Sequence, residues 1–135
     1  MQPMTILLIE DEPVIALELE LELTQAGHRV LMAPDAATAL QLCATQLPDL
    51  AILNFFYAPC PDGMELAHSL RTRFCLPVMF VTGANWKNME ASAFFYAGHE
   101  VLHKPFTKPQ LRAALQAVWK EIAAAKAAHT GLLEG

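Results

Sequence analysis

The chain has 135 residues, of which 54% are hydrophobic and 17% are charged, and its formal net charge is −5. This length suits one domain, and this composition supplies a sizeable hydrophobic core and excludes wholesale disorder. The negative balance and the lack of a Lys/Arg cluster in the sequence argue against a nucleic-acid-binding surface, which needs positive charge opposite the phosphates.

No apolar run approaches the ~20 residues that a membrane helix needs, and the N-terminus has no basic region followed by an apolar stretch. We therefore expect neither a membrane segment nor a signal peptide. The three cysteines, Cys43, Cys60 and Cys75, form an odd set without paired spacing. They argue against a disulfide framework and favour a cytoplasmic location.

Short apolar runs alternate along the chain with longer segments of helical pattern. The short runs predict five strands, at Thr5–Ile9, His28–Met32, Leu50–Leu53, Pro77–Val81 and Glu100–Leu102. The longer segments predict helices at 14–26, 36–45, from about 62, at 86–97 and at 107–127. Helix starts are indicated by Asp35, by Asp62 and by a capping-box pattern from Thr107 to Gln110.

Segment 14–26 carries two conflicting patterns. Leucine and glutamate alternate from Leu17 to Leu23, which is formally a strand period, but both are strong helix formers and we predict a helix. On that helix one apolar stripe packs on the sheet, namely Ile15, Leu19, Leu23 and Ala26. A second stripe, Val14, Leu17 and Leu21, is either further core, which is the simpler interpretation, or an exposed contact surface.

Five successive strand–helix units predict an α/β fold with a parallel sheet covered on both faces. Right-handed crossovers then give a flavodoxin-like three-layer (βα)5 sandwich with strand order 2-1-3-4-5. We expect residues 1–127 to form this domain. Residues 128–135 would be a C-terminal tail, which could derive from cloning.

Polar residues follow the strands at their carboxyl ends, where ligands bind in such sheets. Glu10, Asp11 and Glu12 follow the first strand, Asn54 the third, Thr82 the fourth and Lys104 the fifth. Clustered carboxylates suit Mg²⁺, whereas a hydroxyl and an ammonium can hold phosphate oxygens. Each feature alone has a structural explanation, such as a helix start or a solvated turn, but their joint placement favours a phosphate pocket.

These motifs resemble the receiver domain of two-component response regulators, from about Met4 to Trp119. The matching segments are Ile6–Glu12, Pro48–Asn54, Asp62-Gly63, Val81–Ala84 and Lys104-Pro105-Phe106. The resemblance implies a phosphorelay protein that is not itself an enzyme. Its partners would be a histidine kinase, a phosphotransfer protein or an output protein.

The resemblance also assigns roles in the pocket. Glu10 and Asp11 would bind Mg²⁺ together with the backbone carbonyl of Phe56, and Thr82 and Lys104 would hold the phosphoryl oxygens. Phe80 to Gly83 and Lys104 to Phe106 further resemble the FATGUY receiver subgroup, although Ala84 and Asn85 depart from its motif.

Two residues depart from the receiver pattern. Asn54 occupies the phosphoacceptor position, where the family's aspartate forms an acyl phosphate; a neutral amide cannot do so, and its lack of charge weakens Mg²⁺ binding. Val101 occupies a switch position that is usually Tyr or Phe. We therefore expect a pseudo-receiver that works by protein–protein interaction.

Two alternatives remain open. Residue 54 could be aspartate in the native form, or become one by deamidation, which would restore a working Mg²⁺-dependent phosphoacceptor. A flavodoxin-like carrier of a small ligand such as flavin is disfavoured, because the loop Glu10-Asp11-Glu12 repels phosphate. A homodimer could form through segments 86–97, 100–102 and 107–127, or through 14–26.

Overall fold

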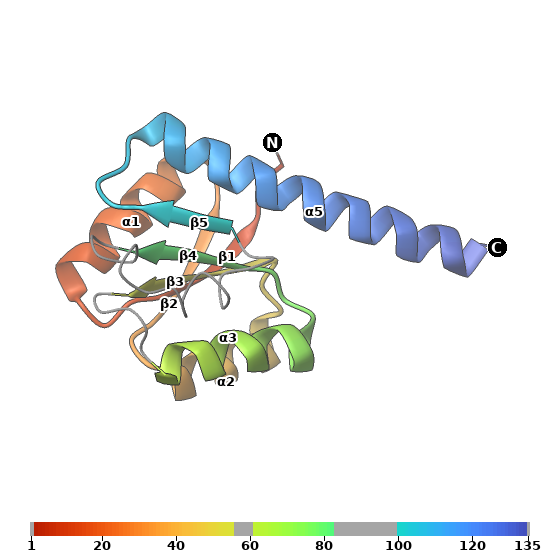
Figure 1. The fold of residues 1–135 in the computed structure, drawn as a ribbon, viewed down its shortest axis with the longest axis horizontal. Helices are drawn as coiled ribbons and strands as arrows, with labels where there is room; N and C mark the ends of the chain where they lie inside the picture. Colours follow the sequence, from red (N-terminus) through yellow and green to blue (C-terminus); the bar gives the residue numbers. More distant parts are fainter. Residues whose placement is uncertain (1, 56–60, 83–99, 135) are drawn as a thin grey trace.

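A computed structural model of the chain describes residues 2–55, 61–82 and 100–134. Five parallel strands form one sheet in the order β2-β1-β3-β4-β5, as the sequence predicts (Figure 1). The strands are β1 (Thr5–Ile9), β2 (Arg29–Ala33), β3 (Leu50–Phe55), β4 (Val78–Thr82) and β5 (Glu100–His103). The described helices are α1 (Pro13–Gln25), α2 (Ala36–Gln46), α3 (Pro61–Phe74) and α5 (Lys108–Glu134).

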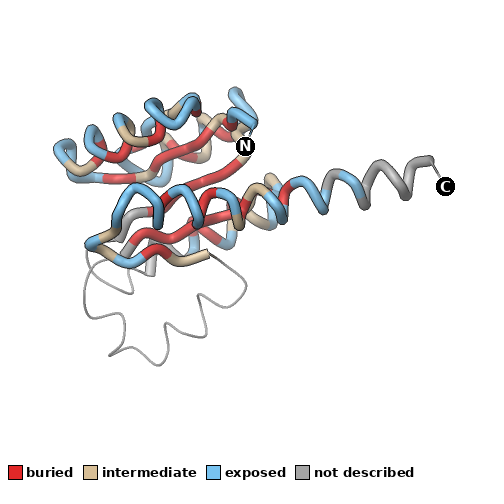
Figure 2. Tube along the Cα trace, turned by 90° about the horizontal axis from the view of Figure 1, so that it is seen from above, coloured by how far each residue is buried: buried red, intermediate tan, exposed pale blue. Residues whose placement is uncertain are grey.

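The helices cover the two faces of the sheet in pairs. Figure 1 shows α1 and α5 on one side and α2 and α3 on the other, and Figure 2 colours the strands largely as buried. Strand residues alternate between the two cores, as a period of two requires. In β1, Ile6 and Leu8 pack with α1 and α5, whereas Leu7 packs with α2 and α3.

Local capping fixes the start of two helices. The Asp35 carboxylate accepts the Thr38 N–H at 2.7 Å, as an N-cap should. At α5, the Thr107 N–H donates to Gln110 Oε1 at 2.8 Å and the Gln110 N–H donates to Thr107 Oγ1 at 3.3 Å. Two of the three predicted helix starts, at Asp35 and at Thr107, are thus confirmed. Helix α3 begins at Pro61, one residue before the predicted Asp62.

Segment Pro13–Gln25 is helical despite its alternating sequence, with Pro13 in the first turn. Its first stripe is largely buried, except for Ala26, which is exposed at the helix end. The second stripe lies in solvent: Val14, Leu17 and Leu21 are 62%, 60% and 57% exposed. The interpretation as additional core is therefore wrong, and the stripe is an apolar surface.

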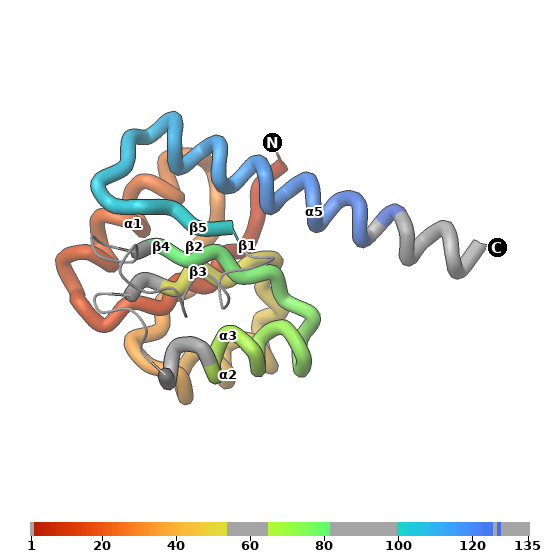
Figure 3. The backbone as a smooth tube through the Cα atoms, viewed as in Figure 1, coloured from red at the N-terminus to blue at the C-terminus, as the bar shows by residue number. Residues whose placement is uncertain are grey.

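The last helix is longer than predicted. It continues past residue 127 to Glu134 and projects well beyond the sheet (Figures 1 and 3). The exposed residues Ala123–Ala125 carry the helix beyond its last buried residue, Ile122, because alanine is a strong helix former. The predicted helix at 86–97 lies outside the described residues. No helix in the described ranges is long and apolar enough to cross a membrane.

Candidate functional site

The strand register brings the predicted site positions to one edge of the sheet. Ile9 pairs with Leu53, so the residues that follow them, Glu10 and Asn54, stand side by side on the backbone. On the other side of β3, Asn54 pairs with Val81 and Phe55 pairs with Thr82. The carboxyl ends of neighbouring parallel strands therefore meet here, as they must when the strands run in one direction.

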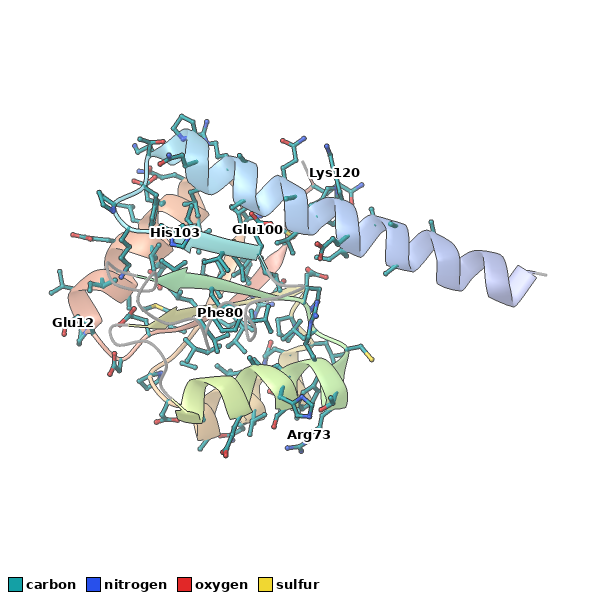
Figure 4. All side chains as sticks on the ribbon, viewed as in Figure 1. Glu12, Arg73, Phe80, Glu100, His103 and Lys120 are labelled. Carbon is teal, nitrogen blue, oxygen red and sulfur yellow. The ribbon has the colours of Figure 1, made fainter. Side chains whose placement is uncertain are left out.

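The far side of this edge is formed by β5. Thr82 pairs with His103, and Lys104 follows directly (Figure 4 labels His103 at this edge, with Glu12 beyond it). The Lys104–Pro105 peptide bond is cis. Backbone placement thus agrees with the predicted order Glu10, Asn54, Thr82 and Lys104 around one mouth.

Glu10 is the buried acid of the site, with only 5% of its surface exposed. Its backbone N–H donates to the Ala33 carbonyl at 3.1 Å, and its Oε1 accepts the Glu12 N–H at 2.9 Å. The buried Oε2 has no hydrogen-bond partner among the described residues. Burial is the largest effect that raises the pKa of Glu10 to about 7, and Asp11 raises it further, against the lowering effects of the Glu12 N–H and of Lys104.

Lys104 supplies the positive charge of the site and is half-buried. Burial lowers the pKa of its ammonium, while the negative charges of Glu10 and Glu18 act in the opposite direction. Glu10 and Lys104 are therefore close enough for each charge to act on the other. A carboxylate and an ammonium at a sheet edge can bind a divalent cation and an anion respectively.

The other predicted residues fall into three groups. Asp11 is exposed beside Glu10, and Val101 is half-buried against the α2–α3 core, paired with Phe80. For Asn54 and Thr82 the structure describes the backbone and no side chain. Phe56, whose carbonyl was predicted as a ligand, lies outside the described residues.

The environment of Glu10 fits a hard cation. A carboxylate oxygen that is buried without a partner is costly, and a Mg²⁺ ion would supply the missing interaction. Glu10 and Asp11 are the described side chains that would hold it. Within the described ranges no group of three or more His, Cys, Asp and Glu side chains gathers around a point.

One feature of the site was missed in the sequence. Helix α1 contributes Glu18 next to Lys104, and a cavity of about 590 Å³ opens between α1 and the loop after β5. Its lining residues are Ile15, Glu18, Leu19, Leu21, Glu22, Lys104, Pro105 and Phe106. The spacing of Glu18 and Glu22 marks one helix face, but only the tertiary structure shows what that face meets.

Comparisons with known proteins agree with this geometry. Residues 6–116 match the family described as "Response regulator receiver domain". The chain is 40% identical over 81 residues to the transcriptional regulatory protein AfsQ1 of Streptomyces coelicolor, covering 60% of this chain and 36% of AfsQ1. It is 34% identical over 108 residues to the uncharacterized transcriptional regulatory protein YrkP of Bacillus subtilis, covering 80% and 46%. The chain thus spans less than half the length of these relatives.

Solved structures give the same result. A putative response regulator from Chloroflexus aurantiacus superposes with a TM-score of 0.73 at 30% identity, covering 87% of this chain and 98% of that one. NtrX from Brucella abortus shares the fold, with a TM-score of 0.82 at 22% identity over 95% of this chain and 29% of NtrX. From its sequence match, strand order and pocket, the chain belongs to the response regulator receiver domain family.

Proposed function

We propose that this chain is a pseudo-receiver: a cytoplasmic, non-enzymatic interaction module of a two-component phosphorelay that takes no phosphate on residue 54. The observation that carries this proposal is the position of Asn54, at the end of β3 beside Glu10. That place holds the family's reactive aspartate. A carboxylate there attacks phosphorus and forms an acyl phosphate, whereas a neutral amide is a far poorer nucleophile.

The described acids offer no replacement at the pocket. Asp49 lies at the opposite edge of the sheet, where its Oδ2 accepts the Thr5 N–H at 2.9 Å. Glu10 and Asp11 are the expected metal ligands. When bound, Mg²⁺ would supply positive charge for an incoming anion, and Glu10 and Asp11 would fix its position; the missing charge at residue 54 weakens that binding.

A working phosphoacceptor is the second candidate. It is favoured by Glu10 and Lys104, which keep the charges that a phosphoryl group and its metal need. In that case residue 54 is aspartate in the native protein. The similarity to the FATGUY subgroup stays a prediction. It bears on the identity of the signalling pathway and does not distinguish a pseudo-receiver from a working phosphoacceptor.

The test is a titration with Mg²⁺ and beryllofluoride, a phosphate mimic, followed by amide NMR shifts in the parent chain and in Asn54→Asp. We expect Asn54→Asp to respond at Glu10, Thr82 and Lys104 while the parent stays unchanged. Intact mass and sequencing of residue 54 are the control for deamidation. The pseudo-receiver proposal would be excluded if the parent chain, with Asn54 intact, responded to Mg²⁺ and beryllofluoride or took label from a small phosphodonor.

We further propose that the exposed stripe of α1 is the partner surface. Val14, Leu17 and Leu21 form an apolar strip larger than isolated surface hydrophobics, and the 590 Å³ cavity adjoins it. Glu18 and Glu22 flank the strip. A homodimer through α1 would bring these acids together, so the charge favours a partner with an apolar strip edged by Lys or Arg, such as a helix of a histidine kinase.

A further inference from the structure

A second cavity lies at the edge of the sheet opposite Glu10 and Lys104. Its volume is about 380 Å³, and it is enclosed by the ends of α2 and α3. Two cysteines line it, Cys43 from the last turns of α2 and Cys75 from the turn between α3 and β4. Nothing in the receiver pocket requires a pair of thiols in this place.

The two thiols differ in their access to solvent. Cys75 is exposed, whereas Cys43 is buried, with 1% of its surface exposed. Burial raises the pKa of the Cys43 thiol above its usual range. Since the thiolate is the attacking species in disulfide exchange, Cys43 is protected from reagents in solution. Cys75 is therefore the thiol that a reagent meets first.

The backbone presents Cys75 in an unusual way. Its φ is 53°, in the left-handed region, and its N–H donates to the Arg71 carbonyl at 3.0 Å to end α3. Glycine is the residue that favours this helix-ending position. Cys75 therefore lines the cavity from a turn and lies outside the regular hydrogen bonding of a helix or strand.

Arg73 adds a positive charge to the same cavity. Its guanidinium lies 5.5 Å from the centroid of the Phe74 ring, and both residues line the cavity with the cysteines. Figure 4 labels Arg73 on the outer side of α3. A guanidinium pairs well with carboxylates, so the residues that line the cavity include an exposed thiol, a buried thiol and one cationic side chain that can pair with an anion.

We propose that this cavity is a thiol–disulfide exchange site for a small anionic disulfide of the oxidised-glutathione type. The Cys75 thiolate attacks one sulfur of the reagent, forms a mixed disulfide and releases the first small thiol. The Cys43 thiol then loses its proton, attacks the Cys75 sulfur and releases the second. Two protein thiols are oxidised to one disulfide, the reagent is reduced to two thiols, and no other oxidant is needed. Disulfides of this transient kind are the ones found in reducing compartments.

The test uses the full chain carrying Cys60→Ser, so that only the two cavity cysteines react. The chain is incubated with oxidised glutathione and quenched with acid, and intact mass and peptide mapping follow the products. We expect the Cys60→Ser chain to lose two hydrogens and to link Cys43 to Cys75. With Cys43→Ser added, the reaction should stop at a glutathione adduct on Cys75. With Cys75→Ser added, Cys43 should react at least tenfold more slowly.

Two controls test the roles of burial and of the Arg73 charge. In urea, Cys43 and Cys75 should react at similar rates, which shows that the native difference comes from burial. Arg73→Gln should slow the reaction with oxidised glutathione several-fold and leave that with a neutral disulfide unchanged. Equal native rates at the two cysteines, a Cys75 adduct that never passes to Cys43, or no reaction at all would each overturn the proposal.

Discussion

Glu10 and Lys104 directly follow β1 and β5, which β3 and β4 separate in the sheet, and each charge acts on the pKa of the other. Burial opposes the charged form of both groups, and in both it is the larger effect. The pocket therefore contains two ionisable groups whose charged forms are destabilised by burial. Such an arrangement is typical of sites whose charges are kept for a ligand.

The raised pKa of Glu10 predicts a pH-dependent cost to stability. With a folded pKa of about 7 against an ordinary value of 4.5, the protonated form is favoured in the fold, so the contribution of Glu10 to stability is fully present below pH 4.5 and is lost as pH rises through 7. The difference corresponds to about 3 kcal/mol. Glu10→Gln should therefore be more stable than the parent by about 2–3 kcal/mol at pH 8, with little difference at pH 4.5.

Urea denaturation at the two pH values measures this effect. Glu12→Gln is the matched control, because it makes the same chemical change on an exposed side chain two residues away. Mg²⁺ should stabilise the parent more than Glu10→Gln, since it binds the charged form. Equal stability of parent and Glu10→Gln at pH 8 would show that burial does not penalise this carboxylate.

His28 predicts an opposite response to acid. The ring is buried, its Nδ1 accepts the Met4 N–H at 3.0 Å, and burial lowers its pKa below the ordinary 6.5. The neutral ring is thus favoured in the fold, so its contribution is present above pH 6.5 and is lost as pH falls through the lowered pKa. Relative to the parent, His28→Gln should lose less stability between pH 7 and pH 4.5. The control is His68→Gln, on an exposed residue of α3, which should follow the parent curve.

Asp49 is predicted to be structural rather than reactive. Its Oδ2 accepts the Thr5 N–H at 2.9 Å and its own N–H donates to the Thr5 carbonyl at 2.8 Å, joining the starts of β1 and β3. Asp49→Ala should destabilise the chain by about 1–3 kcal/mol, because the Thr5 N–H loses its partner. Asp49→Asn should retain most of the stability, since the amide oxygen can accept the same bond. Denaturant midpoints measure both; an Asp49→Asn chain as unstable as Asp49→Ala would contradict this structural role.

The exposed stripe of α1 predicts that a substitution there weakens partner binding and leaves the stability of the fold unchanged. Leu17→Glu should weaken the binding of a histidine kinase or phosphotransfer partner at least tenfold, because it places a charge in an apolar contact. The unfolding midpoint should stay within experimental error, since Leu17 is 60% exposed. Leu47→Glu is the control, because Leu47 is 76% exposed at the opposite edge of the sheet. Interferometry against immobilised partner domains measures both variants, and equal losses would rule out α1 as the specific surface.

The end of α5 tests the domain boundary. Ile122 is buried against the sheet, whereas Ala123, Ala124 and Ala125 are exposed. A chain that stops after residue 127 should therefore melt within about 2 °C of the full chain, because it loses no described core contact. Removing Ile122 as well should lower the melting temperature by several degrees, as a buried side chain is lost. A large loss on the first truncation would extend the domain into 128–135.

The sequence by itself determined the strand order, the two confirmed caps and the place of each polar residue at a strand end. These are local or topological properties: apolar runs, cap residues and right-handed crossovers fix them whatever the rest of the chain does. The departure at Asn54 belongs to the same class, because its place at the end of the third strand follows from the Pro48–Leu53 segment.

Tertiary structure decided the rest. The alternating leucines of α1 allow either core or surface, and only the packing of α5 and the sheet shows that Leu17 and Leu21 lie in solvent. Glu10 and Lys104 are 94 positions apart, so the charge that each exerts on the other depends on distance and burial that no sequence spacing encodes. The same holds for Cys43 and Cys75: an odd cysteine count argued against structural disulfides, yet the turn after α3 brings two thiols to one cavity. Burial and proximity are properties of the whole fold, and for that reason they set the chemistry of these side chains where composition and pattern do not.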